Sequence, residues 1–310
     1  MPIRAGFELS LLQILFALGF ASAAFAAGAN GPIAQHQQLT WEHDAPWFGG
    51  LSGVEMRADG KQLTAISDRG RIIVADLSRD ALGTLTGMEI IHSVALRDKN
   101  GAVMDKPEAD AEGLAIAPDG SIFVSYEGDH RIARTNLADG TPLQFIAPPE
   151  GALLRDNAGF EALAVDATGA LYALPEDNRG DQSPLYKYQA GTWRIAAYLE
   201  NDSPFVPVGA DFDDEGRLYL LERTVTPLGF RTRLRRIELS GDQASAVTLL
   251  QTLPARYDNL EALTVWRDAI GRTRVMMISD DNFLSVQETQ VIELTITQEL
   301  ARVPRLPYNA

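Results

Sequence analysis

Residues 112–125 read EGLAIAPDGSIFVS, and this unit of strand, turn and strand recurs five times along the chain. Each copy opens with a short apolar run, passes through a turn such as Pro118-Asp119-Gly120, and ends in a second apolar run. Asp-Gly and similar pairs supply the positive φ that a tight hairpin needs. The copies begin at residues 52, 112, 161, 208 and 261, with spacings of 60, 49, 47 and 53 residues. A period of about 50 residues is typical of propeller blades.

Further apolar runs follow each unit, such as residues 71–74 and 90–94 in the first repeat, and predict four strands per repeat. Four strands repeated around an axis form a propeller, which leaves only short, protected edges. The sequence therefore predicts an all-β protein with a single propeller of five blades. The last repeat lacks a clear fourth strand, and we expect residues 35–41 to supply it and close the ring. Six blades are the alternative, with irregular strands between Leu96 and Ala111 or after Thr297.

The two ends of the chain differ in character. Arg4 precedes an apolar run at residues 11–20, and Ala24-Phe25-Ala26 fits a signal-peptide cleavage pattern. Residues 1–27 are therefore predicted to be a signal peptide, and residues 28–310 the propeller domain. An uncleaved anchor is the alternative, although the run is short for a membrane span of about 20 residues. The expected location is the bacterial periplasm or the exterior.

Composition limits the partners. The 310 residues include no cysteine, which excludes disulfides, thiol catalysis and cysteine-ligated zinc. The formal net charge of -15 would repel nucleic acid and anionic membrane surfaces. We expect a monomer that acts on a small-molecule substrate, with no nucleic-acid partner and no stable membrane insertion after signal cleavage.

Acidic residues recur at two positions of the repeat. In a propeller, the start of the innermost strand and the end of the second strand meet at the same face, close to the axis. The first position holds Glu112, Glu161 and Glu261, whereas the fourth repeat has Val208 there. The second position is assigned to Asp68, Glu127, Glu176, Glu222 and Asp280, with Asp281 alongside. The sequence thus predicts a ring of carboxylates at one mouth of the central channel.

Such a ring needs compensating charge, because like charges at a narrow mouth repel and raise one another's pKa. Calcium prefers 6–8 oxygen ligands, and Asn178 and Asn282 add amide oxygens near the acids. We therefore predict a Ca²⁺ site with ligands from Glu112, Glu127, Glu161, Glu176, Glu222, Glu261 and Asp280. The alternatives are that Arg131, Arg179 and other arginines neutralise the acids, or that the acids cap turns.

Three motifs carry a family resemblance: Ile66-Ser67-Asp68-Arg69-Gly70, the stretch 108–114 (EADAEGL) and the stretch 278–283 (ISDDNF). They resemble motifs of the bacterial phytase-like family, whose name refers to an esterase-like activity of phytase. The resemblance runs from about Phe48 to Leu294, nearly the whole chain after the signal. It implies a hydrolytic activity of the phytase or phosphodiesterase kind. The motif acids implied as catalytic are Asp68, Glu112, Glu161, Asp280 and Asp281.

The leading functional hypothesis is metal-assisted hydrolysis of phosphoesters, in which bound metal lowers the pKa of an attacking water. Arg69 and Arg223 would bind the phosphate of the substrate. The alternatives are a non-catalytic binding module, since fold does not dictate function, and a calcium-dependent lactonase. A serine esterase is disfavoured because residues 50–54 (GLSGV) lack the G-x-S-x-G spacing. The four histidines, His36, His43, His92 and His130, show no metal-binding spacing.

Overall fold

The computed structural model describes residues 32–152, 154–155, 159–177, 179–201 and 204–297. Within these ranges every regular element is a β-strand, and none of the described residues forms a helix able to cross a membrane. The predicted signal peptide, residues 1–27, lies outside the described residues.

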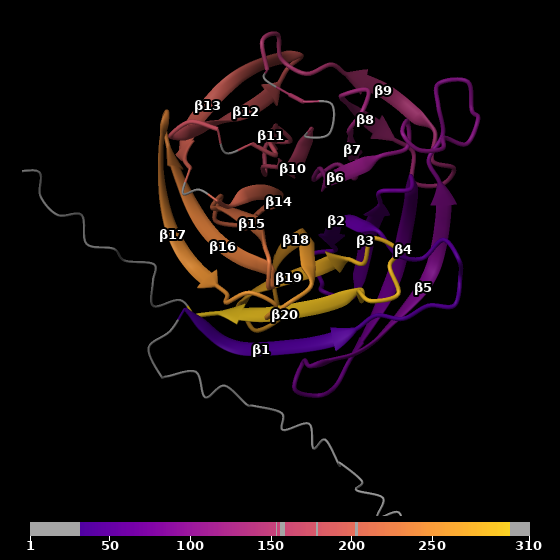
Figure 1. The fold of residues 1–310 in the computed structure, drawn as a ribbon, viewed down its shortest axis with the longest axis vertical. Coiled ribbons are helices and arrows are strands. Elements are labelled where there is room, and N and C mark those ends of the chain that lie inside the picture. The colour runs from indigo at the N-terminus through magenta and orange to yellow at the C-terminus, as the bar shows by residue number, and fades with distance from the viewer. Residues whose placement is uncertain (1–31, 153, 156–158, 178, 202–203, 298–310) are drawn as a thin grey trace, which may run out of the picture.

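The described strands form five four-stranded sheets around a central axis, and each sheet is one blade of a propeller (Figure 1). The first blade comprises β2 (Leu51–Met56), β3 (Gln62–Ser67), β4 (Arg71–Arg79) and β5 (Leu85–Ala95). The second comprises β6 (Ala111–Ile116), β7 (Ile122–Tyr126), β8 (Arg131–Thr135) and β9 (Pro142–Ile146). The third comprises β10 (Phe160–Val165), β11 (Leu171–Pro175), β12 (Gln182–Gln189) and β13 (Thr192–Glu200).

The last two blades complete the ring. The fourth blade comprises β14 (Val206–Phe212), β15 (Leu218–Thr226), β16 (Gly229–Ser240) and β17 (Gln243–Gln251). The fifth comprises β18 (Asn259–Arg267), β19 (Thr273–Asp280), β20 (Gln290–Ile296) and β1 (Ile33–Thr40). Strand β1 pairs antiparallel with β20 as the outer strand of this sheet, so the two ends of the described chain share one blade.

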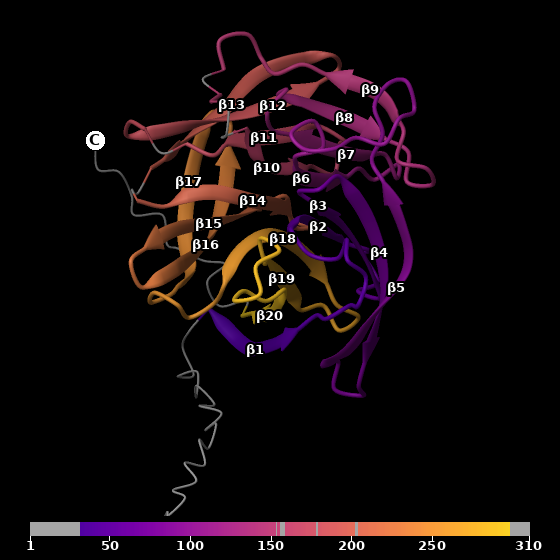
Figure 2. The ribbon, with the colours of Figure 1, turned by 45° about the vertical axis from the view of Figure 1, so that its right-hand side comes forward.

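The prediction of five blades is confirmed. The connection from Leu96 to Ala111 holds only an isolated bridge between Arg97 and Val103, so it adds no sheet to those in the described part of the chain. The tail after Thr297 lies outside the described residues. The innermost strands β2, β6, β10, β14 and β18 surround the axis, as the two views show (Figures 1 and 2).

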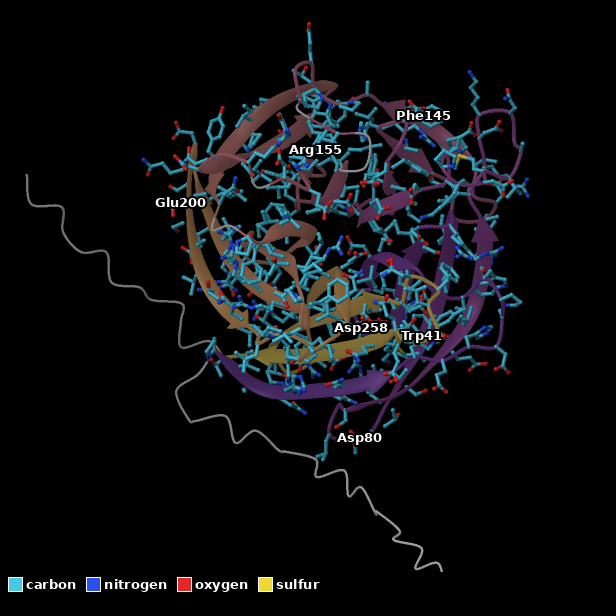
Figure 3. All side chains as sticks on the ribbon, in the orientation of Figure 1. Trp41, Asp80, Phe145, Arg155, Glu200 and Asp258 are labelled. Atoms are coloured by element: carbon cyan, nitrogen blue, oxygen red, sulfur yellow. The ribbon has the colours of Figure 1, made fainter. Side chains whose placement is uncertain are left out.

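Side chains fill the space between neighbouring blades (Figure 3). Where the fifth blade meets the first, Trp266, Met276 and Ile278 pack in one buried cluster with Leu51 and Leu63. Removing this apolar surface from water is the main force that holds the ring together.

Hydrogen bonds also join the innermost strands of neighbouring blades. The Thr264 hydroxyl accepts a hydrogen bond from the Met56 amide at 2.9 Å, and the Asp211 carboxylate accepts one from the Val265 amide at 2.6 Å. The innermost strands are therefore held in fixed positions relative to one another, which fixes the side chains that they carry at the axis.

Candidate active site at the mouth of the channel

Each innermost strand carries a β-bulge near its start. The pairing register shifts between Leu51 and Gly53 in the first blade, and at the equivalent place in every other blade. Bulges re-aim side chains at the rims of sheets. The residues set at the bulges are Ser52, Glu112, Glu161, Val208 and Glu261. These five positions form the first ring of the mouth.

The second ring follows from the pairing of the second strands. In four blades, one residue of the second strand pairs with the residue just after the bulge, and these equivalent residues are Ile66, Leu174, Leu221 and Ile278. Two positions further along the chain in these four blades lie Asp68, Glu176, Arg223 and Asp280, and Glu127 holds the equivalent position in the second blade. These five residues form the second ring. The mouth is defined here as these two rings together, and seven of their ten side chains are carboxylates.

The prediction for the fourth blade needs correction, because the register places Arg223 in the second ring in place of Glu222. Glu222 is 2% exposed and lies within the blade. Its two carboxylate oxygens accept hydrogen bonds from the guanidinium groups of Arg233 and Arg235, at 2.6–3.0 Å. Glu222 therefore neutralises two buried arginines and is not a candidate metal ligand.

The second and third blades bring acids close enough to share a cation. One group consists of Asp110, Glu112 and Glu127, and the other of Glu127, Glu161 and Glu176. Within each group, one carboxylate oxygen of every member lies within 4.8 Å of the others. Glu127 belongs to both groups, so its carboxylate is placed where it would lie between two cations if each group bound one.

These carboxylates are destabilised as anions when no cation is bound. Burial and then the charge of Glu161 raise the pKa of Glu112 well above its ordinary value. Burial and then a hydrogen bond with Glu127 do the same to the pKa of Glu161. Burial also raises the pKa of Glu176, although Arg223 opposes this shift. The chemistry of this donor set fits a hard divalent cation.

Arg223 is the counter-ion that lies between the third and fifth blades at the mouth. Its guanidinium donates to the Asn259 side chain at 2.7 Å and to Glu176 at 3.2 Å, and it lies 3.1 Å from Glu261. Its Nε is buried and has no hydrogen-bond partner among the described residues. Burial, followed by the charge of Glu261, raises the pKa of Asp280 to about 8. Arg223 thus offsets part of the negative charge and leaves the rest uncompensated.

Lys106 is a further cation at the mouth, and unlike Arg223 it was not identified from the sequence. It lies in the connection before β6, 2.6 Å from Asp68 and 2.9 Å from Asp110. Asp110 was also missed as a ligand, although it stands two residues before Glu112 in the acidic stretch 108–114. Neither residue falls at a repeated position, so the repeat pattern alone did not identify them.

Asp281 has a positioning role that differs from the catalytic role implied by the resemblance. Its carboxylate accepts hydrogen bonds from the amides of Gly50 and Phe283 and from the Thr289 hydroxyl, at 2.9–3.0 Å. Gly50 has φ of +62°, and a Cβ there would collide with the Asp68 carboxylate. Asp281 therefore holds the loop before β2 against the mouth.

The remaining predicted site residues lie around this rim. The Arg69 guanidinium is exposed and stacks on the Phe283 ring, 3.3 Å from its centroid. His130 is the histidine beside the acids: a Cβ on Gly159 would lie 3.1 Å from its Nδ1 and 3.3 Å from the Glu127 side chain. His130 Nδ1 is buried without a hydrogen-bond partner in the described structure.

The channel is packed shut beneath the acids. A cavity of about 10 Å³ on the axis is lined by Val54, Leu114, Leu163, Ala210 and Leu263, together with bulge residues and neighbouring glycines. This volume corresponds to one water molecule at most. The mouth is therefore a cup with acidic walls and an apolar floor.

The fold and the mouth together define a five-bladed β-propeller with an acidic site on its axis. The family model described as "Phytase-like: Esterase-like activity of phytase" matches residues 46–283, and the chain belongs to this family. No curated protein matches the sequence.

Solved structures share the propeller fold at low identity. The aldose sugar dehydrogenase of Streptomyces coelicolor is 14% identical with a TM-score of 0.45, over 86% of this chain and 100% of that one. The virginiamycin B lyase of Staphylococcus aureus is 11% identical with a TM-score of 0.42, over 85% of this chain and 99% of that one. A luciferin-regenerating enzyme is 12% identical with a TM-score of 0.45, over 84% and 95%. These proteins are similar in fold alone.

Proposed function

We propose that this protein is a secreted, metal-assisted hydrolase of phosphoesters whose site is the mouth of the propeller. The observation that carries the proposal is the pair of carboxylate groups that share Glu127. Family membership supports hydrolysis as the type of reaction.

The donor set favours calcium. Asp110, Glu112, Glu127, Glu161 and Glu176 provide several hard oxygen ligands on rigid strands or directly beside them. Calcium takes 6–8 oxygens, so waters and substrate oxygens would complete its shell. When bound, the metal would polarise the phosphoryl group and lower the pKa of an attacking water. The acids would hold this site in place, and the blades would keep them from moving apart.

Arginines at the rim suit an anionic substrate. Arg223 lies beside Glu176 and carries a buried Nε with no hydrogen-bond partner in the described parts of the chain. Arg69 extends an exposed guanidinium from the turn after Asp68. Guanidinium groups bind phosphate oxygens through charge-assisted hydrogen bonds. Seven carboxylates line the mouth, and Arg223 and Lys106 offset only part of their charge. The remaining negative charge would repel a phosphate, which is why metal binding must precede substrate binding in this scheme.

The test combines stability and turnover on the same samples. We expect added calcium to raise the melting temperature of the parent above its value in chelator, because a ligand that binds only the native state stabilises it. Glu161→Gln and Asp280→Asn should lose most of this rise, whereas Asp242→Asn, in the exposed β16–β17 turn, should keep it.

A substrate panel distinguishes the alternatives. Calcium-dependent turnover of a phosphodiester, a phosphomonoester or phytate supports the proposal. Turnover of a lactone alone would make the protein a lactonase. No metal response and no turnover would leave a non-catalytic binding module, with the acids as an ion-paired structural ring. Secretion and a monomeric state remain part of the proposal and are checked by cell fractionation and by light scattering.

A further inference from the structure

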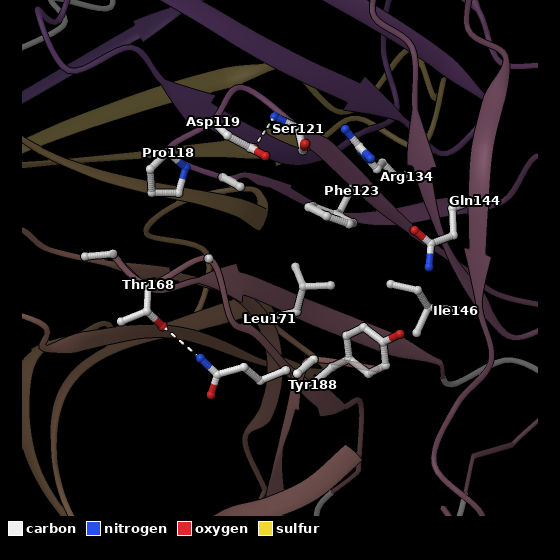
Figure 4. Close-up of a pocket in the computed structure, with 15 residues that line it drawn as sticks. Pro118, Asp119, Ser121, Phe123, Arg134, Gln144, Ile146, Thr168, Leu171 and Tyr188 are labelled. Carbon is white, nitrogen blue, oxygen red and sulfur yellow. Dashed lines mark hydrogen bonds between the residues drawn. The ribbon is translucent and has the colours of Figure 1, made fainter. Parts of the chain in front are cut away.

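A groove of about 400 Å³ lies between the second and third blades, at the end of the propeller away from the mouth (Figure 4). It opens between the β6–β7 and β10–β11 turns, because the innermost strands end on that face. Its apolar walls include Phe123, Leu171 and Tyr188, and its polar lining includes Arg134 and Gln144. This volume is typical of small-molecule sites, which usually span about 300–1,000 Å³.

Arg134 is the unusual residue of this groove. Its Nε is buried and has no hydrogen-bond partner, and its guanidinium forms no ion pair within the described part of the chain. A buried donor without a partner costs free energy, since it has lost its water without replacement. Asp119 is the one acid among the described residues of the lining, and its carboxylate accepts a hydrogen bond from the Ser121 amide at 2.9 Å. The Ser121 hydrogen bonds and, to a smaller extent, the charge of Arg134 lower the pKa of Asp119, but the two side chains form no ion pair.

Other blades show what Arg134 lacks. In the third blade, Lys187 occupies the position equivalent to Arg134, because Tyr172 pairs with Lys187 as Phe123 pairs with Arg134. Lys187 lies 3.1 Å from Asp166, the first residue of the adjacent turn.

The same turn position holds an acid in two further blades. Asp213 binds Arg217 at 2.7 Å in the fourth blade, and Asp268 binds Arg272 at 2.8 Å in the fifth. In those two blades the acid pairs with the residue four positions on, the place that Ser121 holds in the second blade, so the third blade is the direct comparison for Arg134.

In the second blade this turn position holds Ala117. The Ala117 amide donates a hydrogen bond to the Ser121 carbonyl, and in the third blade the Asp166 amide donates one to the Ala170 carbonyl, so Ala117 and Asp166 are equivalent. Relative to the third blade, the second keeps the cation and lacks the carboxylate at the first position of the turn, and the groove occupies the space beside them.

We propose that the groove binds a small organic carboxylate. Its carboxylate would take the place of the acid missing at Ala117 and pair with Arg134, and its apolar part would lie against Phe123, Leu171 and Tyr188. Two features distinguish this from a plain surface hollow: the Arg134 Nε, which has no hydrogen-bond partner among the described residues, and the apolar side chains that both blades contribute to the lining. The site is separate from the mouth and does not depend on the proposed hydrolase activity.

The experiment titrates benzoate into the ¹⁵N-labelled protein and follows amide chemical shifts, with neutral benzamide as the matched control. We expect saturable shifts at Ser121, Gly169 and Ala190 with benzoate, and weaker ones with benzamide. Arg134→Gln should weaken benzoate binding by about tenfold or more, since a charge-assisted pair is lost. Arg97→Gln, an arginine outside the groove, should bind benzoate as the parent does.

Ala117→Asp provides a second variant with an opposite effect on stability. It rebuilds the ion pair that the third blade makes between Asp166 and Lys187, so it should raise the melting temperature and compete with benzoate. Equal binding of benzoate and benzamide, or full binding by Arg134→Gln, would reduce the groove to an apolar hollow and overturn the proposal. No saturable shift with millimolar benzoate would overturn it as well.

Discussion

Arg223 shows how a single residue sets the charge balance of the mouth. Its guanidinium contacts Glu176, Glu261 and Asn259, which come from the third and fifth blades. Replacing Arg223 by Gln leaves two largely buried carboxylates without their cation. Losing one partner of a buried ion pair costs about 3–5 kcal/mol.

We therefore expect Arg223→Gln to melt at a lower temperature than the parent in chelator. Calcium should recover more of the loss than it adds to the parent, because it replaces the missing positive charge. Arg69→Gln is the control, since Arg69 is exposed and stacks on Phe283. A calcium-induced rise in Arg223→Gln that matches that of the parent would show that the arginine and the metal do not share carboxylates.

At the scale of the element, the β15–β16 hairpin separates structural acids from site acids. Glu222 pairs across the two strands with Arg233 and Arg235, whereas the next residue, Arg223, faces the mouth. Glu222→Gln should lower the free energy of unfolding by about 3–5 kcal/mol, because it removes the negative charge that two buried guanidinium groups share.

The same variant should keep the full calcium-induced rise in melting temperature, in contrast to Glu161→Gln. Thermal unfolding of both proteins, with chelator and with calcium, makes the comparison. If Glu222→Gln loses its response to calcium while its stability in chelator is unchanged, the register derived for the fourth blade is incorrect.

The geometry of the strands also explains which features could be predicted from the sequence and which could not. Apolar runs and Asp-Gly turns predicted the five repeats, and acids at repeated positions predicted most of the two rings. The prediction for the fourth blade was wrong because it chose Glu222 where the pairing places the next residue, Arg223. In a strand, an error of one residue moves a side chain to the opposite face. The bulges that re-aim Glu112 and its equivalents are marked in the sequence only by a Gly or Ala at the next position, which does not by itself identify a bulge. Lys106 was missed because it belongs to a connection outside the repeat.

At the scale of the whole molecule, four of the five blades bring carboxylates to one end of the axis, in a chain of net charge -15. Rigid packing between blades prevents the acids from separating to relieve their repulsion. Protons or cations must therefore relieve it, and the two should compete for the same oxygens. The stability of the protein is thus expected to depend on pH strongly without metal and only weakly with metal bound.

In chelator, the sign of this dependence follows from the raised pKa values of Glu112, Glu161 and Asp280, the last at about 8. The carboxyl groups have ordinary pKa values in the unfolded chain and raised ones in the native state. Between these values the native state binds more protons than the unfolded chain, so stability falls as pH rises. We expect the melting temperature in chelator to decrease between about pH 5 and pH 8, a range above the ordinary carboxyl pKa. Asp280→Asn should flatten the upper part of this curve, because its side chain no longer ionises. Saturating calcium should remove most of the slope in the parent, since the metal replaces the protons. A chelated protein whose melting temperature is constant or rises over this range would mean that the acids of the mouth are already compensated by Arg223 and Lys106, and that no metal is needed there.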